Sequence, residues 1–427
     1  MRPELSDSTQ ANLLLTAPLK SGRTAAASET LTPKEYRKLA GVLNDSRLQS
    51  SDLLTSDLGA LPPDVWQIVD RERLKRLLGR GFLLSQAIEH WQARALWIVS
   101  PPDESYPARL INLLKDSAPP ILYGCGDHSL LDKGGLALVG SRNVDQLIIE
   151  FTEETARLTA KAGKTVVSGG ARGVDQAAMR GALQAGGCVI GVLADSLETS
   201  AMNREHRAYI LDEQLVLISP YDPLAGFNVG NAMQRNKLVY ALADAALVVN
   251  SDVNKGGTWS GAKEQLDNFR FVTVYTRSTG EDSPGLEALL QRGAKPWPNP
   301  IEPEELVSVL DIEPRPQSPT QAEFALSTSA QVPPESGPGQ PERVRGKDVT
   351  VSEGDVAEEL FSKVRELLLD LLATPQRPAK IAAELQVTPS QAAKWLQRLA
   401  DEGVIQKRTL PVEFSIWLPQ ANEKTQK

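Results

Sequence analysis

Six short apolar runs, separated by segments of helical character, constrain the fold of this chain most strongly. They read "LALVG", "KTVVSG", "CVIGVLA", "LVLIS", "AALVVN" and "FVTVY" between residues 136 and 275. Runs this rich in Val, Ile and Leu are typical of strands that are buried on both faces. Between the first two lies "DQLIIEFTEETARLTAKAG", which has apolar residues at helical spacing. Strand and helix in regular alternation predict an α/β fold with a doubly wound parallel sheet.

Polar, glycine-rich loops follow or precede several of these strands. The first strand ends in "GSRN", the second in "SGGARGVD", and "QRNKL" and "NKGGTWSGA" flank the fifth. Ligands of open parallel sheets bind outside the carboxyl ends of the strands, and glycines let backbone N–H groups approach an anion. We therefore expect a phosphate-bearing ligand there, with Arg142, Arg172, Arg235 and Lys237 converging as cations and Ser141, Ser168, Asn236 and Thr258 as neutral donors.

A single Gly-Gly turn is more often a matter of backbone geometry than of function, so the hypothesis of a phosphate site depends on the four loops together.

The sequence gives little support for catalysis. No Walker lysine–serine pattern and no G-x-G-x-x-G motif is present, and no histidine lies near a candidate nucleophile. Asp175 and Glu264 are more simply a helix cap and an exposed helix residue. We expect no catalytic residue, no metal and no cofactor.

The ordered string of these motifs resembles the DprA/Smf family of DNA-processing proteins over about residues 96–274. The resemblance is carried by "GSR", by "SGGARGVDQAAMRGAL", by "RNK" and by "KGGT". It implies an extended Rossmann-like domain that binds single-stranded DNA without catalysis, forms a homodimer and helps to load the RecA recombinase in transformation and recombination. The implied DNA-binding residues are Gly140, Ser141, Arg142, Ser168, Gly169, Gly170, Arg172, Gly173, Arg235, Asn236, Lys237, Gly256, Gly257 and Thr258.

The chain departs from the family pattern at several positions. Met179 stands where the family has a histidine, and Ala232-Met233 stand where it has an aromatic residue and a proline. An aromatic residue there would stack on a base, and Phe227 and Trp259 are the candidates to replace it. Two alternatives stay open. One is a sensor of a nucleotide-derived ligand in phage defence or regulation. The other is a nucleotide phosphoribohydrolase, because the loop "KGGTWSG" of this chain faintly resembles a loop of those enzymes.

The rest of the chain predicts further domains. With 427 residues, 41% of them hydrophobic, two or three cores are expected. We predict a disordered tail (residues 1–30), a small N-terminal helical domain (31–127), the Rossmann-like domain (128–297), a Pro-rich linker (298–354) and a C-terminal winged helix-turn-helix (355–420). No apolar run suggests a membrane span, and two cysteines without a disulfide framework favour the cytoplasm.

The winged helix is a candidate contact for duplex DNA or for a protein. Its third predicted helix carries Lys394 and Arg398 on one face, and its hairpin carries Lys407 and Arg408. The net charge of this segment is near zero, so the sequence does not decide between duplex DNA and a protein as its partner. The formal net charge of −8 argues against a protein coated in basic charge, but it leaves room for a local basic pocket.

Overall fold

The computed structural model describes residues 5–19, 30–55, 58–281 and 283–311, and part of the chain beyond. In that last part it describes two strands, 405–409 and 412–416, and the single residues 368, 372, 380, 381, 384, 395, 396 and 399. The chain divides into two compact units, Met1–Ala325 and Leu326–Lys427.

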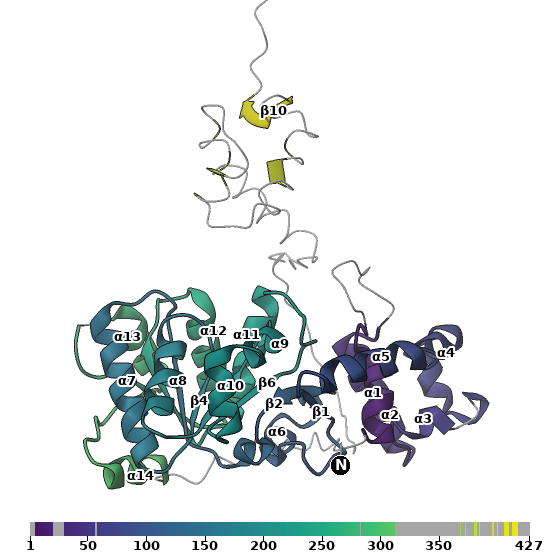
Figure 1. Ribbon diagram of the computed structural model, residues 1–427, viewed down its shortest axis with the longest axis horizontal. Coiled ribbons are helices and arrows are strands. Elements are labelled where there is room, and N and C mark those ends of the chain that lie inside the picture. Colours follow the sequence, from purple (N-terminus) through teal and green to yellow (C-terminus); the bar gives the residue numbers. More distant parts are fainter. Residues whose placement is uncertain are drawn as a thin grey trace, which may run out of the picture. The chain divides into compact units, whose positions relative to one another are not determined.

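A nine-stranded sheet organises the first unit (Figure 1), with the strand order β1-β2-β6-β5-β4-β3-β7-β8-β9. Neighbours from β6 to β9 run parallel, whereas β1 pairs with β2 and β2 with β6 in antiparallel register. The strands are β1 (Trp97–Val99), β2 (Leu122–Cys125), β3 (Leu136–Gly140), β4 (Val166–Ser168), β5 (Val189–Val192), β6 (Leu215–Ser219), β7 (Ala245–Asn250), β8 (Thr273–Thr276) and β9 (Lys295–Pro296).

Two apolar cores lie on the two faces of this sheet. Alternate residues of one strand enter different cores: Leu136 and Leu138 of β3 belong to the first and Ala137 to the second. Helices cover both faces, so the six predicted strands, which are β3 to β8, and the doubly wound α/β class are confirmed. The first core takes α7 (Gln146–Lys161), α8 (Val174–Gln184), α9 (Leu197–Ala201), α10 (Arg204–Leu211) and α14 (Pro303–Asp311), and the second takes α6 (Ala108–Leu114), α11 (Val229–Ala241), α12 (Gly256–Glu264) and α13 (Pro284–Gln291).

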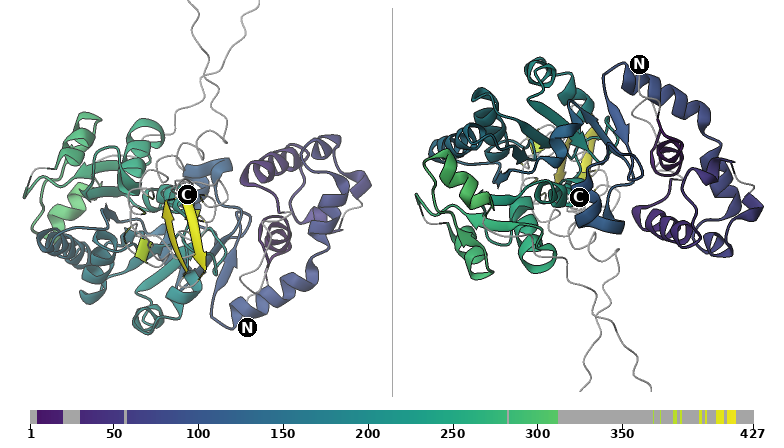
Figure 2. Two further views of the ribbon diagram at one scale, coloured as in Figure 1. Left: turned by 90° about the horizontal axis from the view of Figure 1, so that it is seen from above. Right: turned by 90° about the horizontal axis from the view of Figure 1, so that it is seen from below.

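Five helices precede the sheet, and four of them gather around α1, which lies in the middle of the group (Figure 2). They are α1 (Asp7–Thr16), α2 (Pro33–Asp45), α3 (Asp52–Thr55), α4 (Arg71–Leu78) and α5 (Gly81–Gln92). Short helical turns complete the unit: Leu58–Ala60, Pro63–Gln67, Lys115–Ser117, His128–Asp132 and Gln265–Phe269.

The disordered tail expected over residues 1–30 is wrong for α1. Ser6 caps this helix by accepting a hydrogen bond from the Thr9 N–H, 3.1 Å away. Leu15 is buried among the N-terminal helices, whereas Leu13 and Leu14 are buried in the first sheet core. These three leucines therefore form a core contact between the N-terminal helices and the sheet.

The predicted boundary at residues 127/128 also needs correction. Strands β1 and β2 precede it, β1 pairs with β2, and β2 pairs with β6, so the sheet begins at Trp97. These strands are only three and four residues long, so their sequences alone did not assign them to the sheet.

The predicted linker starts too early as well. Within residues 298–354 the structure has α14, which packs on α7 and buries Leu306 and Leu310. The segment as a whole is rich in Pro, Ser, Glu and Gln, and this average composition did not reveal the amphipathic helix near its start. A linker can therefore begin only at residue 312.

In the second unit, β10 (Ile405–Thr409) pairs with β11 (Val412–Ile416) in antiparallel register. This is the strand pair predicted for the winged helix, and it places Lys407 opposite Phe414 and Arg408 opposite Glu413. Lys394 and Arg398 lie outside the described residues. Throughout the described residues of both units, every helix is too short or too polar to cross a membrane.

Candidate functional site

A pocket of about 680 Å³ opens at the carboxyl ends of β3 and β7. These neighbours mark the point where the strand order reverses, because the chain runs from β3 outward through β4, β5 and β6 and then returns to β7 on the other side. Open α/β sheets bind their ligands at such a switch point. The pocket is lined by Val139, Gly140, Ser141, Arg142, Asn143, Ala171, Asp175, Phe227, Val229, Ala232, Met233, Arg235, Asn236, Val239, Tyr240, Asp252, Asn254, Lys255, Gly256, Gly257, Thr258 and Ser260.

Polar side chains tie the loops of this pocket together. The Thr258 hydroxyl donates to the Gly140 carbonyl at 2.8 Å, and the Asn236 amide donates to the Gly257 carbonyl at 2.9 Å. These donors were expected to face the ligand. The single hydroxyl proton of Thr258 is instead used to hold the start of α12 against the end of β3, so its role is to position the loops.

Arg235 forms the floor of the pocket. It lies on α11, is only 6% exposed, and its guanidinium fills the space beside Gly169, where a Cβ atom would collide with Nη1. Its Nε is buried without a hydrogen-bond partner. A buried donor of this kind is costly unless something accepts its proton, so the floor of the pocket is suited to an anion.

Asp175 lies in the first turn of α8 beside Arg235 and is itself buried. Burial raises its pKa to about 6, although the nearby Arg235 and the backbone N–H groups of Ala171 and Gly140 act in the opposite direction. Burial likewise lowers the pKa of Arg235, which the charge of Asp175 opposes. The carboxyl therefore titrates near neutral pH, within the electrostatic reach of the pocket floor.

At the mouth of the pocket, Arg142 extends from the loop after β3 and lies over the ring of Phe227. Its guanidinium carbon is 4.8 Å from the ring centroid, a cation–π contact. A guanidinium that stacks through its flat face keeps its N–H edge free for phosphate.

The opposite wall is the start of α12. This helix of nine residues begins at Gly256, and its Lys255 N-cap makes no side-chain capping bond. Gly256 has φ +82°, a conformation that favours glycine, and a Cβ atom there would meet nothing within 4 Å. Open backbone N–H groups and the positive end of the helix dipole both favour an anion at this wall.

Of the fourteen predicted binding residues, the structure brings together eight in this pocket: Gly140, Ser141, Arg142, Arg235, Asn236, Gly256, Gly257 and Thr258. It does not bring Lys237 there. Burial and the charge of Arg37 on α2 lower the pKa of Lys237, and the charge of Glu264 on α12 raises it, so this side chain lies within the electrostatic reach of both helices. Arg172 is exposed on the loop before α8 but does not line the pocket.

The remaining four predicted residues shape the backbone. Ser168 is fully buried and donates to the Leu138 carbonyl at 2.7 Å. Gly169 makes room for Arg235, as described, and Gly170 has φ +69°. Gly173 has φ +87°, and a Cβ atom there would lie 2.5 Å from the Ser141 carbonyl oxygen. The loop after β4 is bare because it packs against an arginine and against the neighbouring loop.

Sequence reasoning missed part of the pocket. Lys255 stands in the quoted loop "NKGGTWSGA" but was not singled out, and neither was Asn254. Val229 and Met233 also line the pocket, and only their place beside the arginine motif could have signalled it. Trp259, one of two candidates for base stacking, is wrong: it is 4% exposed, with its ring near Arg292.

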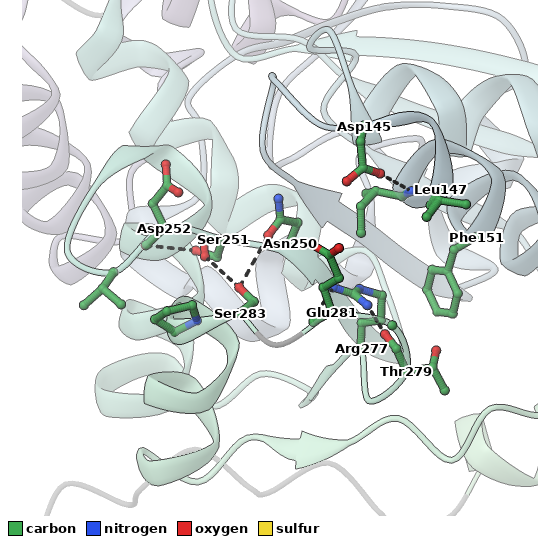
Figure 3. Close-up of a pocket in the computed structure, with 15 residues that line it drawn as sticks. Asp145, Leu147, Phe151, Asn250, Ser251, Asp252, Arg277, Thr279, Glu281 and Ser283 are labelled. Carbon is green, nitrogen blue, oxygen red and sulfur yellow. Dashed lines mark hydrogen bonds between the residues drawn. The ribbon is translucent and has the colours of Figure 1, made fainter.

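A second pocket of about 380 Å³ lies beyond the ends of β7 and β8 (Figure 3). Its one arginine, Arg277, is already satisfied by the carbonyls of Val249, Thr279 and Glu281. Asp145, Asp252 and the Glu281 side chain add negative charge around it. With three carboxylates around one arginine, this pocket is less suited to phosphate than the pocket at the switch point, although Asp252 lines both. Among the described side chains, no group of three or more His, Cys, Asp and Glu residues is placed to hold a metal ion.

The fold and the pocket define an open α/β protein with a pocket lined by cationic side chains at its switch point. The sequence profile of the family described as DNA recombination-mediator protein A matches residues 97–309, about half of the chain. The chain belongs to this family, which is the DprA/Smf family.

Two relatives illustrate the similarity. Protein Smf of Synechocystis sp. is 31% identical over 230 residues, covering 52% of this chain and 57% of that protein. Protein Smf of Escherichia coli (strain K12) is 31% identical over 206 residues, covering 46% of this chain and 53% of that protein. The chain thus matches little more than half the length of either relative.

The fold also resembles a solved structure, the X-ray structure of DNA processing protein A (DprA) from Streptococcus pneumoniae. The TM-score is 0.52 at 20% identity, and the match covers 72% of this chain and 98% of that chain.

Proposed function

We propose that the switch-point pocket binds single-stranded DNA, mainly through its phosphates. The buried Arg235 carries this proposal, because its Nε has no partner and the residue lines the pocket. Arg142 and Lys255 add charge at the mouth, and the start of α12 adds backbone donors. A phosphodiester supplies the acceptors that all of these groups need.

The form of the pocket favours one strand over a duplex. Its volume of about 680 Å³ suits a nucleotide unit, whereas paired strands have no room to reach Arg235. Exposed apolar side chains at the mouth are also better matched to unstacked bases than to the outside of a helix. Membership of the DprA/Smf family supports the same ligand.

We infer that the pocket binds without turnover. No histidine lines it, and its one buried carboxyl, Asp175, lies beside Arg235. Incubation with nucleoside monophosphates and triphosphates should release neither base nor phosphate. Release that disappears on changing Asp175 or Glu264 would make the chain an enzyme of the phosphoribohydrolase kind.

Further parts of the proposal rest on family membership alone. We infer a homodimer, a cytoplasmic location, and assistance to the RecA recombinase in transformation or recombination. Sedimentation of the purified chain tests for the homodimer. A single-strand exchange assay with RecA, with and without the chain, tests for assistance to the recombinase.

The C-terminal unit is proposed to be a winged helix on a Pro-rich linker. The hairpin of β10 and β11 and the composition of residues 312–354 support it. Binding of duplex DNA by the isolated residues 355–427, or its absence, decides between duplex DNA and a protein as its partner.

The competing function is a sensor of a nucleotide-derived ligand, which the modest pocket volume would also suit. Titration with oligo(dT) and with free nucleotides separates the two functions. We expect oligo(dT) to bind far more tightly than any mononucleotide, because a strand engages several phosphates at once. A mononucleotide that binds more tightly than oligo(dT) would establish the sensor instead.

A further inference from the structure

Apolar side chains gather on one side of the pocket mouth. Phe227 is 54% exposed, Val229 is 62% exposed and Met233 is 40% exposed, and all three line the pocket. They come from the segment between β6 and the second turn of α11. Clustered apolar surface beside a polar pocket marks a place where a ligand contributes an apolar face.

Phe227 is the aromatic side chain that such a face can reach. The other aromatic residue that lines the pocket, Tyr240, is 2% exposed. Tyr221 is partly buried, and its hydroxyl donates to the Asn231 carbonyl at 3.1 Å. Ala232 and Met233, at the position where an aromatic residue was expected, offer no ring.

The contact with Arg142 orients Phe227. The guanidinium covers one face of the ring at 4.8 Å. More than half of the side chain is nevertheless exposed, so the rest of the ring stays open to the pocket mouth. One ring can therefore hold the phosphate-binding arginine on one side and meet a base on the other.

Building on the proposed function, we propose that Phe227 is a base-stacking platform. The phosphates of the strand lie along Arg142, Arg235 and the start of α12, and a base covers the open face of the Phe227 ring between Val229 and Met233. The binding energy that the missing aromatic residue at Ala232-Met233 would supply comes instead from a loop five residues earlier.

The test compares a labelled oligo(dT) with an abasic deoxyribose-phosphate chain of the same length, by fluorescence anisotropy. Phe227→Ala should weaken oligo(dT) binding by about tenfold, the loss of one stacked base, and weaken binding of the abasic chain much less, because the abasic chain loses only the contact of the ring with Arg142. Phe227→Tyr, which keeps the ring, should bind both ligands as the wild type does.

Phe82→Ala is the matched control. Phe82 is a more exposed phenylalanine on α5 that does not line the pocket, so its removal should affect neither ligand. Wild-type affinity of Phe227→Ala for oligo(dT) would overturn the inference. An equal loss on both ligands would overturn it too, because the ring would then act only by holding Arg142. Failure of the wild type itself to bind oligo(dT) is a different result, which removes the proposed function.

Discussion

At the scale of single residues, the pair of Asp175 and Arg235 sets the charge of the pocket floor. With Asp175 ionised, its charge offsets much of the attraction that Arg235 exerts on an anion. Because burial raises the pKa of Asp175 to about 6, the carboxyl becomes neutral within an accessible pH range. The pocket should be more cationic below pH 6 than above it.

We therefore expect oligo(dT) affinity to rise as the pH falls from about 7.5 to 5.5. The charge of a phosphodiester does not change in this range, and no histidine lines the pocket. Asp175→Asn should bind more tightly at pH 7.5 and lose the pH dependence. A pH profile that is the same in the wild type and in Asp175→Asn would contradict this account.

The same carboxyl links pH to stability. Its folded pKa of about 6 lies above the ordinary value of 3.8, so the folded chain holds this proton more tightly than the unfolded chain. The resulting contribution to the free energy of unfolding is fully present below the ordinary value and is lost as the pH rises through 6. Urea unfolding of the wild type and of Asp175→Asn at pH 5 and pH 7.5 should show a difference that grows with pH.

At the scale of elements, the fit between the loops after β3 and β4 decides where Arg142 lies. Gly173→Ala forces a Cβ atom to within 2.5 Å of the Ser141 carbonyl and strains a positive φ. We expect a loss of more than about 1 kcal/mol in unfolding free energy, with weaker oligo(dT) binding because the backbone that carries Arg142 moves.

Gly163→Ala is the control for this change. Gly163 also has a positive φ of +67°, but a Cβ atom there meets nothing within 4 Å. It should lose stability from strain alone and bind oligo(dT) as the wild type does. Equal binding losses in the two variants would show that loop packing does not position the site.

The sequence predicted β3 to β8 because buried parallel strands are continuous apolar runs that need no partner to be recognised. It did not assign β1, β2 and α1 to the sheet and its core, because their short apolar segments are stabilised by contacts with distant residues. The helical geometry of α11 already implied that Arg235 and Lys237 lie on different faces. Two residues along α11 rotate a side chain by about 200°, so the two cations cannot share a face. The burial of Asp175 and Arg235 depends on tertiary packing, which no local pattern reports.

At the scale of the whole molecule, α14 belongs to the core that supports the pocket. A chain that ends at residue 311 should fold and bind oligo(dT) as the full chain does. A chain that ends at residue 297 loses Leu306 and Leu310 from the core, at a cost of about 3 kcal/mol or more. Thermal unfolding of the two truncated chains checks this, and equal midpoints would show that α14 contributes nothing.

The composition of residues 312–354 makes a further prediction at this scale. A linker of this length has a root-mean-square span of roughly 35 Å, so the second unit could meet its partner without touching the pocket. Limited proteolysis should cut first in this segment. Fragments that begin or end within 97–309 instead would argue against a linker.

The central claim is that Arg142 and the start of α12 bind the phosphates of a single strand. The most direct test is the salt dependence of oligo(dT) affinity for the wild type and for Arg142→Ala/Lys255→Ala, with Arg157→Ala/Arg180→Ala as control. Arg157 and Arg180 pair with Glu154 and Glu153 on the surface, away from the pocket lining. The pocket variant should bind at least about tenfold more weakly and flatten the slope of log affinity against log salt by about 1.4, whereas the control keeps both. An unchanged affinity and slope in the pocket variant would contradict the claim.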